Sequence, residues 1–167
     1  SPSTLWGQKE CAIPPQHFSP HGIDLARRPN GDLMLLVVNH SELDSVQFFK
    51  VIRTEGNLSL QWQGCVFMPN DLDLNDVVAL PQGGFVTTAA KVSNKELLVT
   101  QPGMHVLQWT EGAGLSTLLE QETGYANGIA VSPDGSTLFV NDTVGGRGVM
   151  KVSLPEGNIL TKAAVKM

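Results

Sequence analysis

The chain has 167 residues, and its hydrophobic fraction of 41% is enough to build a buried core. It carries 11 Lys and Arg against 16 Asp and Glu, and a net charge of −5 with scattered basic residues argues against a nucleic-acid-binding protein. No apolar run approaches the roughly 18 residues of a membrane span, and residues 1–20 do not have the pattern of a secretory signal. We therefore expect a soluble globular protein whose cellular compartment stays open.

The two cysteines, Cys11 and Cys65, have no metal-binding spacing. Three interpretations remain: two buried free thiols, a disulfide that ties the N-terminal segment to the body, or a reactive thiol. We favour free thiols, and a nucleophile is the least favoured, because nothing in the sequence around either cysteine would lower its pKa.

A short polar pattern recurs along the chain. It occurs as His21-Gly22-Ile23-Asp24, Asn75-Asp76-Val77-Val78 and Asn127-Gly128-Ile129-Ala130, so its copies begin 54 and 52 residues apart. A repeat of this length is typical of propeller blades.

The same order of strands and turns follows each copy. After the opening strand, the first unit predicts strands over 33–38, 46–53 and 58–67, and the second over 85–90, 104–110 and 115–120. The third unit predicts strands over 137–140, 149–154 and 159–165. We place an N-terminal segment at 1–20 and blades at 21–69, 73–122 and 127–167, all within one structural unit.

These patterns predict an all-β protein made of three four-stranded propeller blades. Pro and Gly fall between the strands and helical spacing is almost absent, so a helical solenoid is disfavoured. A β-sandwich is the main rival, but it does not explain a polar dipeptide at the same place in each unit. In a propeller the loops that lead into the innermost strands converge on the central channel.

Three stretches carry a resemblance to a known family. They are SPHGI (19–23) with LLVVNH (35–40), LNDVVA (74–79) and YANGIAVSPDG (125–135). Together they resemble the paraoxonase, or arylesterase, family of calcium-dependent lactonases, and the last stretch is also similar to gluconolactonase-type and strictosidine-synthase-type propellers. The resemblance implies a six-bladed propeller, of which this chain would be half, with two calcium ions in its channel.

The resemblance also implies roles for individual residues. His21 matches the histidine that acts as general base, and His40 matches its partner. Asn75 and Asn127 match ligands of the catalytic calcium, whereas Asp76 and the Ile23 carbonyl match ligands of the structural calcium. The chemistry is coherent, because calcium takes oxygen ligands and leaves the imidazoles free for proton transfer.

The other ligands of the catalytic calcium, a glutamate in the family's first blade and an aspartate-asparagine pair in its fifth, have no counterpart here. Two neutral amides from one chain make a poor divalent-cation site, so calcium is doubtful in the isolated chain. An open stack of three blades also exposes a blade face at each end. We expect two copies to pair as a homodimer that completes a six-bladed ring.

Two functional hypotheses remain. The first is a lactone or ester hydrolase that uses His21 and His40 near calcium once the ring is assembled. The second is a non-catalytic half-propeller that binds a partner or a small ligand after losing the remaining calcium ligands. A fragment of a longer enzyme is the third possibility. The acidic cluster of Asp71, Asp73 and Asp76 fails the EF-hand pattern and is expected to be a solvated loop.

Overall fold

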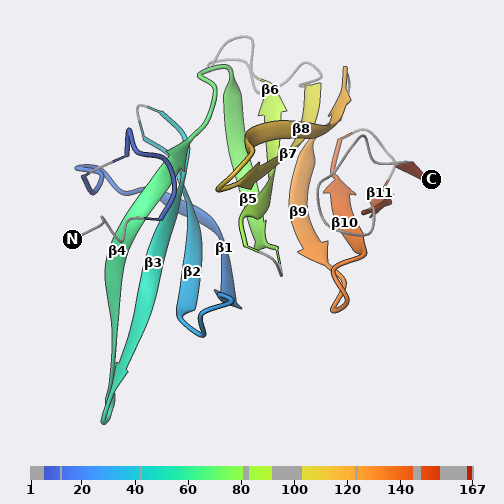
Figure 1. Ribbon diagram of the computed structural model, residues 1–167. Coiled ribbons are helices and arrows are strands. Elements are labelled where there is room, and N and C mark those ends of the chain that lie inside the picture. The colour runs from blue at the N-terminus through green and yellow to red at the C-terminus, as the bar shows by residue number, and fades with distance from the viewer. Residues whose placement is uncertain are drawn as a thin grey trace.

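Three antiparallel β-sheets stand side by side in chain order in the computed structural model (Figure 1). The structure describes residues 6–11, 13–41, 43–80, 83–91, 103–122, 124–144, 148–154 and 165–166, and this part of the chain contains no helix. Consequently, no helix among these residues is long and apolar enough to cross a membrane. The all-β prediction with blade-like sheets is confirmed.

Each sheet has four strands, and neighbours in the sheet are also neighbours in the chain. The first sheet contains β1 (Pro20–Arg27), β2 (Leu33–Asn39), β3 (Ser45–Thr54) and β4 (Asn57–Phe67). The second contains β5 (Leu72–Ala79), β6 (Phe85–Lys91), β7 (Gly103–Thr110) and β8 (Gly114–Gln121). The third contains β9 (Ala126–Val131), β10 (Thr137–Asp142), β11 (Gly148–Ser153) and β12 (Val165–Lys166). Most of the predicted strand 159–165 lies outside the described residues.

Two separate hydrophobic cores hold the three sheets together. The first lies between the first and second sheets, where the ring of Phe48 is 6.0 Å from that of Phe85 and 5.8 Å from that of Trp109. The second lies between the second and third sheets and includes Met104 and Leu138, both fully buried. The second sheet contributes side chains from both of its faces, one face to each core, which explains why its sequence is almost continuously apolar.

The recurring dipeptide is a β-bulge in the innermost strand of each sheet. In β1 the register shifts between Pro20 and Ile23, in β5 between Leu74 and Val77, and in β9 between Ala126 and Ile129. Two residues on the bulged strand therefore oppose one on its partner, which bends the strand and redirects its side chains. The sequence placed the dipeptides in loops before these strands, whereas the structure places them within the strands.

The N-terminal segment pairs with the outer edge of the first sheet. The Trp6 amide donates to the Gln63 carbonyl at 2.8 Å, and the Gln8 amide donates to the Cys65 carbonyl at 2.9 Å. Cys11 and Cys65 form a disulfide that secures this segment to β4. The preference for two free thiols was therefore wrong, because pairing along β4 brings cysteines 54 residues apart in sequence into bonding range.

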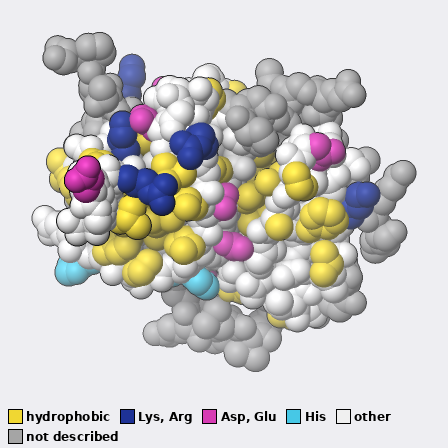
Figure 2. Space-filling view, turned by 90° about the horizontal axis from the view of Figure 1, so that it is seen from below, with side chains coloured by type: hydrophobic (Ala, Val, Ile, Leu, Met, Phe, Trp, Pro, Cys, Tyr) yellow, Lys and Arg dark blue, Asp and Glu magenta, His cyan; other side chains and the backbone are white. Residues whose placement is uncertain are grey.

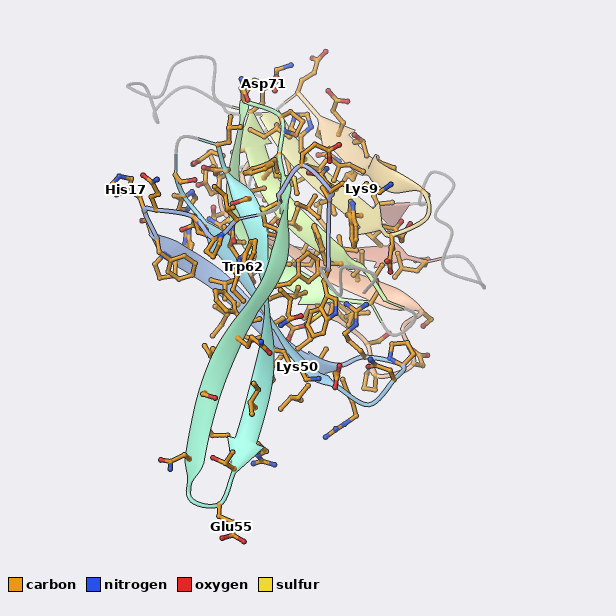
Figure 3. The ribbon with its side chains drawn as sticks, turned by 60° about the vertical axis from the view of Figure 1, so that its left-hand side comes forward. Lys9, His17, Lys50, Glu55, Trp62 and Asp71 are labelled. Carbon is orange, nitrogen blue, oxygen red and sulfur yellow. A yellow bond between two sulfur atoms is a disulfide. The ribbon has the colours of Figure 1, made fainter. Side chains whose placement is uncertain are left out.

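The hairpin between β3 and β4 projects beyond the sheet, with Glu55 at its tip (Figure 3). Leu58 and Leu60 on this hairpin are 69% and 54% exposed. The projecting end of the first sheet therefore exposes apolar side chains that no other sheet among the described residues covers.

Candidate functional site

The site is built from the three bulges, each of which contributes one residue pair. His21, Asn75 and Asn127 occupy the first bulge position, and Gly22, Asp76 and Gly128 occupy the second. β5 contacts both β1 and β9, so the bulges lie on adjacent innermost strands. The repeat therefore brings together residues that are more than 100 positions apart in the sequence.

Asp76 fits between the two glycines of the neighbouring bulges. A Cβ atom added to Gly22 would lie 2.4 Å from Asp76 Oδ1 and 2.6 Å from the Asn75 carbonyl oxygen. A Cβ added to Gly128 would lie 3.8 Å from Asp76 Oδ2 and 3.1 Å from Asn141 Nδ2. The second sheet supplies the Asp76 carboxylate, and Gly22, which has no side chain, leaves the space that this carboxylate occupies.

Hydrogen bonds hold this carboxylate and connect it to the third sheet. Asp76 Oδ2 accepts from the Ile129 amide at 3.0 Å, and Oδ1 accepts from the Val77 amide at 2.9 Å. The Asp76 amide donates to Thr88 Oγ1 at 3.1 Å, and the Thr88 hydroxyl donates to the Asn127 carbonyl. Hydrogen bonds with β6 and with β9, the strands on either side of Asp76, thus hold this residue in place.

A second aspartate ties the first two sheets together in the same way. Asp24 Oδ2 accepts from the Ala79 amide at 2.7 Å, while Oδ1 accepts from the Leu25 amide at 2.9 Å. Charge-assisted hydrogen bonds of this kind are stronger than neutral ones. Asp24 and Asp76 therefore fix the relative positions of the three innermost strands.

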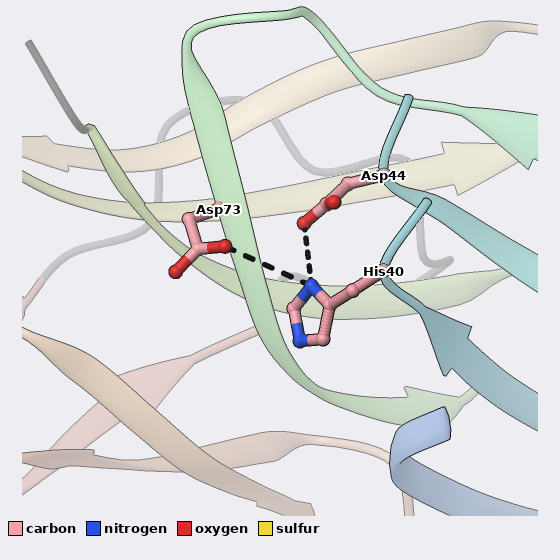
Figure 4. A group of neighbouring side chains, drawn as sticks. All are labelled: His40, Asp44 and Asp73. Atoms are coloured by element: carbon pink, nitrogen blue, oxygen red, sulfur yellow. Dashed lines mark hydrogen bonds and ion pairs between the residues drawn. The ribbon is translucent and has the colours of Figure 1, made fainter. Parts of the chain in front are cut away.

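The two predicted histidines are in direct contact. Figure 4 shows the His40 ring with the carboxylates of Asp44 and Asp73 beside it. His21 Nδ1 lies 2.9 Å from His40 Nε2. On the other side of the ring, His40 Nδ1 lies 3.0 Å from Asp44 Oδ2 and 3.7 Å from Asp73 Oδ1. Asp44 is buried, and its Oδ2 also accepts from the Leu74 amide at 2.8 Å. Asp44, His40 and His21 therefore form a continuous line of polar contacts.

The sequence did not predict that Asp44 and Asp73 lie beside the His40 ring. Asp73 was assigned to a solvated loop, but it lies in β5 and faces the His40 ring. Asp44 follows His40 by four residues, and this spacing was the only sequence signal that could have pointed to it. Its contact with Leu74, 30 residues further on, depends on the packing of two sheets.

Several of these residues offer oxygen atoms to a cation. The Asn75 side chain is 6% exposed and has no hydrogen-bond partner within the part of the chain that the structure describes, and the Asn127 side chain likewise has none there. With Asp76 they provide the amide and carboxylate oxygens that calcium prefers. Ile23 has an aliphatic side chain without a ligand atom, so only its backbone carbonyl could contribute. These donors suit calcium in kind, but they are fewer than the six to eight oxygens that it takes.

His40, Asp44 and Asp73 are a second group with ligand atoms close together. Their atoms lie within 4.8 Å of one another. The hydrogen bonds already described account for the positions of His40 and Asp44, so the geometry needs no ion there.

Charge is unevenly distributed over the end of the stack shown in Figure 2. Most of the visible Lys and Arg side chains lie over the first sheet, while some acidic side chains lie near the middle of this face between hydrophobic patches and others lie toward its edges. Acidic side chains at the centre favour the approach of cations over anions.

The stacked antiparallel sheets define a propeller-like all-β protein, and comparison with known families agrees. The model of the SMP-30/gluconolactonase/LRE-like region matches residues 30–166, which is most of the chain. The chain therefore belongs to this family, whose propellers are of the six-bladed type.

Comparisons with solved structures and with curated proteins say less about this chain than the family match does. The chain resembles the crystal structure of a candidate 6-phosphogluconolactonase from Bacteroides uniformis, with 12% sequence identity and a TM-score of 0.43. The similarity covers 97% of this chain but only 57% of that protein, so the chain spans little more than half of its length. No curated protein matches the chain significantly.

Proposed function

We propose that this chain carries the catalytic histidines of a lactone or ester hydrolase and half of the ring in which they work. The observation that carries the proposal is the contact of 2.9 Å between His21 Nδ1 and His40 Nε2 beside three bulges that present amide and carboxylate oxygens. Membership of a family named for gluconolactonase supports the same class of reaction. The resemblance to paraoxonases supports the finer assignment to a calcium-dependent lactonase or arylesterase.

In this proposal His21 is the general base. Its Nδ1 faces His40, which leaves Nε2 to accept a proton from water. The water oxygen forms a bond to the carbonyl carbon, the bond from that carbon to the leaving oxygen breaks, and the proton passes to the leaving alkoxide. His40 holds the His21 ring in place during the transfer. Histidine suits this role because its pKa ordinarily lies close to neutrality.

Asn75 and Asn127 would hold the catalytic calcium, and Asp76 with the Ile23 carbonyl would hold the structural calcium, each together with oxygen ligands from outside the described residues. Calcium bound at Asn75 and Asn127 would supply an electrophile for the substrate carbonyl oxygen. The bulges position the side chains, and Gly22 leaves the space for Asp76.

Hydrolysis assays test the proposal directly. Phenyl acetate and an aliphatic δ-lactone would be incubated with the chain at several calcium concentrations, with calcium binding followed by calorimetry. We expect calcium-dependent turnover that is lost in His21→Gln and retained in His17→Gln, since His17 is exposed and accepts a hydrogen bond from Asn39 through its backbone carbonyl, which this substitution keeps. Turnover in His21→Gln equal to wild type would refute the role of His21. No calcium binding and no turnover would favour the alternative, a non-catalytic half-propeller that binds a partner or small ligand.

Ring closure by a second copy of this chain is the proposed route to a complete channel. By register, Leu35 and Phe49 of the first sheet correspond to Phe85 and Trp109 of the second. Phe85 and Trp109 are buried against the preceding sheet, with Phe48 in contact. The face that carries Leu35 and Phe49 has no preceding sheet among the described residues, and its apolar pocket is about 410 Å³.

The third sheet offers the complementary face. Phe139 and Val149 are 39% and 65% exposed, and by register they correspond to Leu36 and Val46, which are buried between the first two sheets. In a twofold ring of two copies, this face of each copy would cover the first sheet of the other.

Sedimentation at micromolar concentration tests this arrangement. We expect a dimer that dissociates both in Leu60→Asp, on the first sheet, and in Val149→Asp, on the third. Val144→Asp, a change at an exposed valine in the turn after β10, serves as the matched control and should stay dimeric. A stable wild-type monomer would refute ring closure by a second copy. The proposed catalytic role of His21 would still be tested separately by the hydrolysis assay.

A further inference from the structure

The contacts around His40 point to a role for Asp44 that deepens the proposed function and rests on it. A neutral histidine carries its proton on one ring nitrogen and accepts a hydrogen bond at the other. Which nitrogen is protonated decides whether the pair can place a free acceptor nitrogen toward water. The groups that contact the His40 ring therefore indicate which of its nitrogens carries the proton.

Two carboxylate oxygens of the described residues lie near His40 Nδ1. Asp44 Oδ2 lies 3.0 Å away and Asp73 Oδ1 lies 3.7 Å away. An ionised carboxylate has only acceptor sites, so the close contact with Asp44 requires Nδ1 of His40 to carry a proton. His40 Nε2 is then the acceptor in the neutral ring, and His21 must donate to it from Nδ1.

We propose that Asp44 is a positioning residue that fixes both histidines as their Nδ1–H tautomers. The consequence is that His21 Nε2 is left unprotonated and able to act as the base. Asp44 is suited to this task because its Oδ2 also accepts from the Leu74 amide at 2.8 Å. Leu74 precedes Asn75 directly, so one buried carboxylate aligns the histidine pair of the first sheet with the bulge of the second.

Asp73 provides a matched comparison. It approaches the same nitrogen, but at 3.7 Å it is beyond hydrogen-bond distance, and its side chain is 32% exposed compared with 6% for Asp44. A contact of this length and exposure contributes little. We therefore assign the orienting role to Asp44 and not to Asp73.

Nitrogen-15 NMR of the histidine side chains tests the tautomers without an activity assay. Spectra of wild type, Asp44→Ala and Asp73→Ala would be recorded at alkaline pH with a chelator present to remove stray cations. We expect protonated Nδ1 and unprotonated Nε2 in both His21 and His40 of wild type and of Asp73→Ala. Asp44→Ala should show a mixture of tautomers, and its kcat should fall by at least about tenfold.

The outcomes separate this inference from the proposed function. Protonated Nε2 in wild-type His40, or unchanged tautomers in folded Asp44→Ala, would overturn the role of Asp44. The expected tautomers in a chain without hydrolytic activity would uphold the orienting role and refute the proposed function. If Asp44→Ala does not fold, Asp44→Asn replaces it, because asparagine keeps an acceptor oxygen for the Leu74 amide. The wild-type spectrum alone also tests the proposal, since protonated Nε2 in His40 would refute it.

Discussion

Replacing Gly22 with alanine tests whether the close approach of β1 and β5 builds the site. The added Cβ would lie 2.5 Å from Asp76 Cα and 2.6 Å from the Asn75 carbonyl oxygen. These are backbone atoms, which cannot rotate away, so the two innermost strands must separate. Overpacking of this kind costs about 1–3 kcal/mol, and we expect the upper end.

Thermal unfolding followed by circular dichroism measures the effect. A loss of about 3 kcal/mol corresponds to a decrease in Tm of roughly 6–12 °C for a chain of this size. Gly112→Ala is the matched control, because a Cβ there meets no atom within 4 Å, and its stability should change by less than about 0.5 kcal/mol. Adding Asp76→Ala to Gly22→Ala should not restore stability, since the backbone contacts remain. A Tm of Gly22→Ala equal to that of the control would refute this packing.

Three further predictions concern the body of the protein. Phe48→Ala should lower the free energy of unfolding by about 3–5 kcal/mol in urea titrations, whereas Leu58→Ala, at an exposed position, should change it by less than about 0.5 kcal/mol; equal effects would contradict the assigned core. Cys11→Ser should cost up to about 4 kcal/mol, because the disulfide to Cys65 closes a loop over a sequence separation of 54, and an unchanged melting curve would count against that estimate. Burial lowers the pKa of His105 below 6.5, so protonation favours the unfolded state and stability should fall as pH decreases below that value. His105→Gln should flatten this part of the stability profile, and a profile identical to wild type would contradict the assignment.

The repeated pattern explains why the strands were predictable from sequence. Alternation of apolar and polar residues, and turns such as Pro29-Asn30-Gly31-Asp32, are local features that need no knowledge of distant contacts. The boundaries predicted for the strands at 33–38, 46–53 and 58–67 agree with β2, β3 and β4 to within one or two residues. Bulges were harder to predict, because a bulge is defined by the pairing of two strands and not by one of them.

Local patterns along the chain predicted an all-β protein with three similar units and indicated a set of candidate site residues, namely His21, His40, Asn75, Asp76 and Asn127. Which of these residues are in contact became clear only from the packing of the sheets. This packing joined Asp44 to His40 and Leu74, inserted Asp76 beside Gly22, and paired Cys11 with Cys65. Strand formation follows from short-range periodicity, whereas these contacts arise only when whole sheets pack at a fixed separation and register.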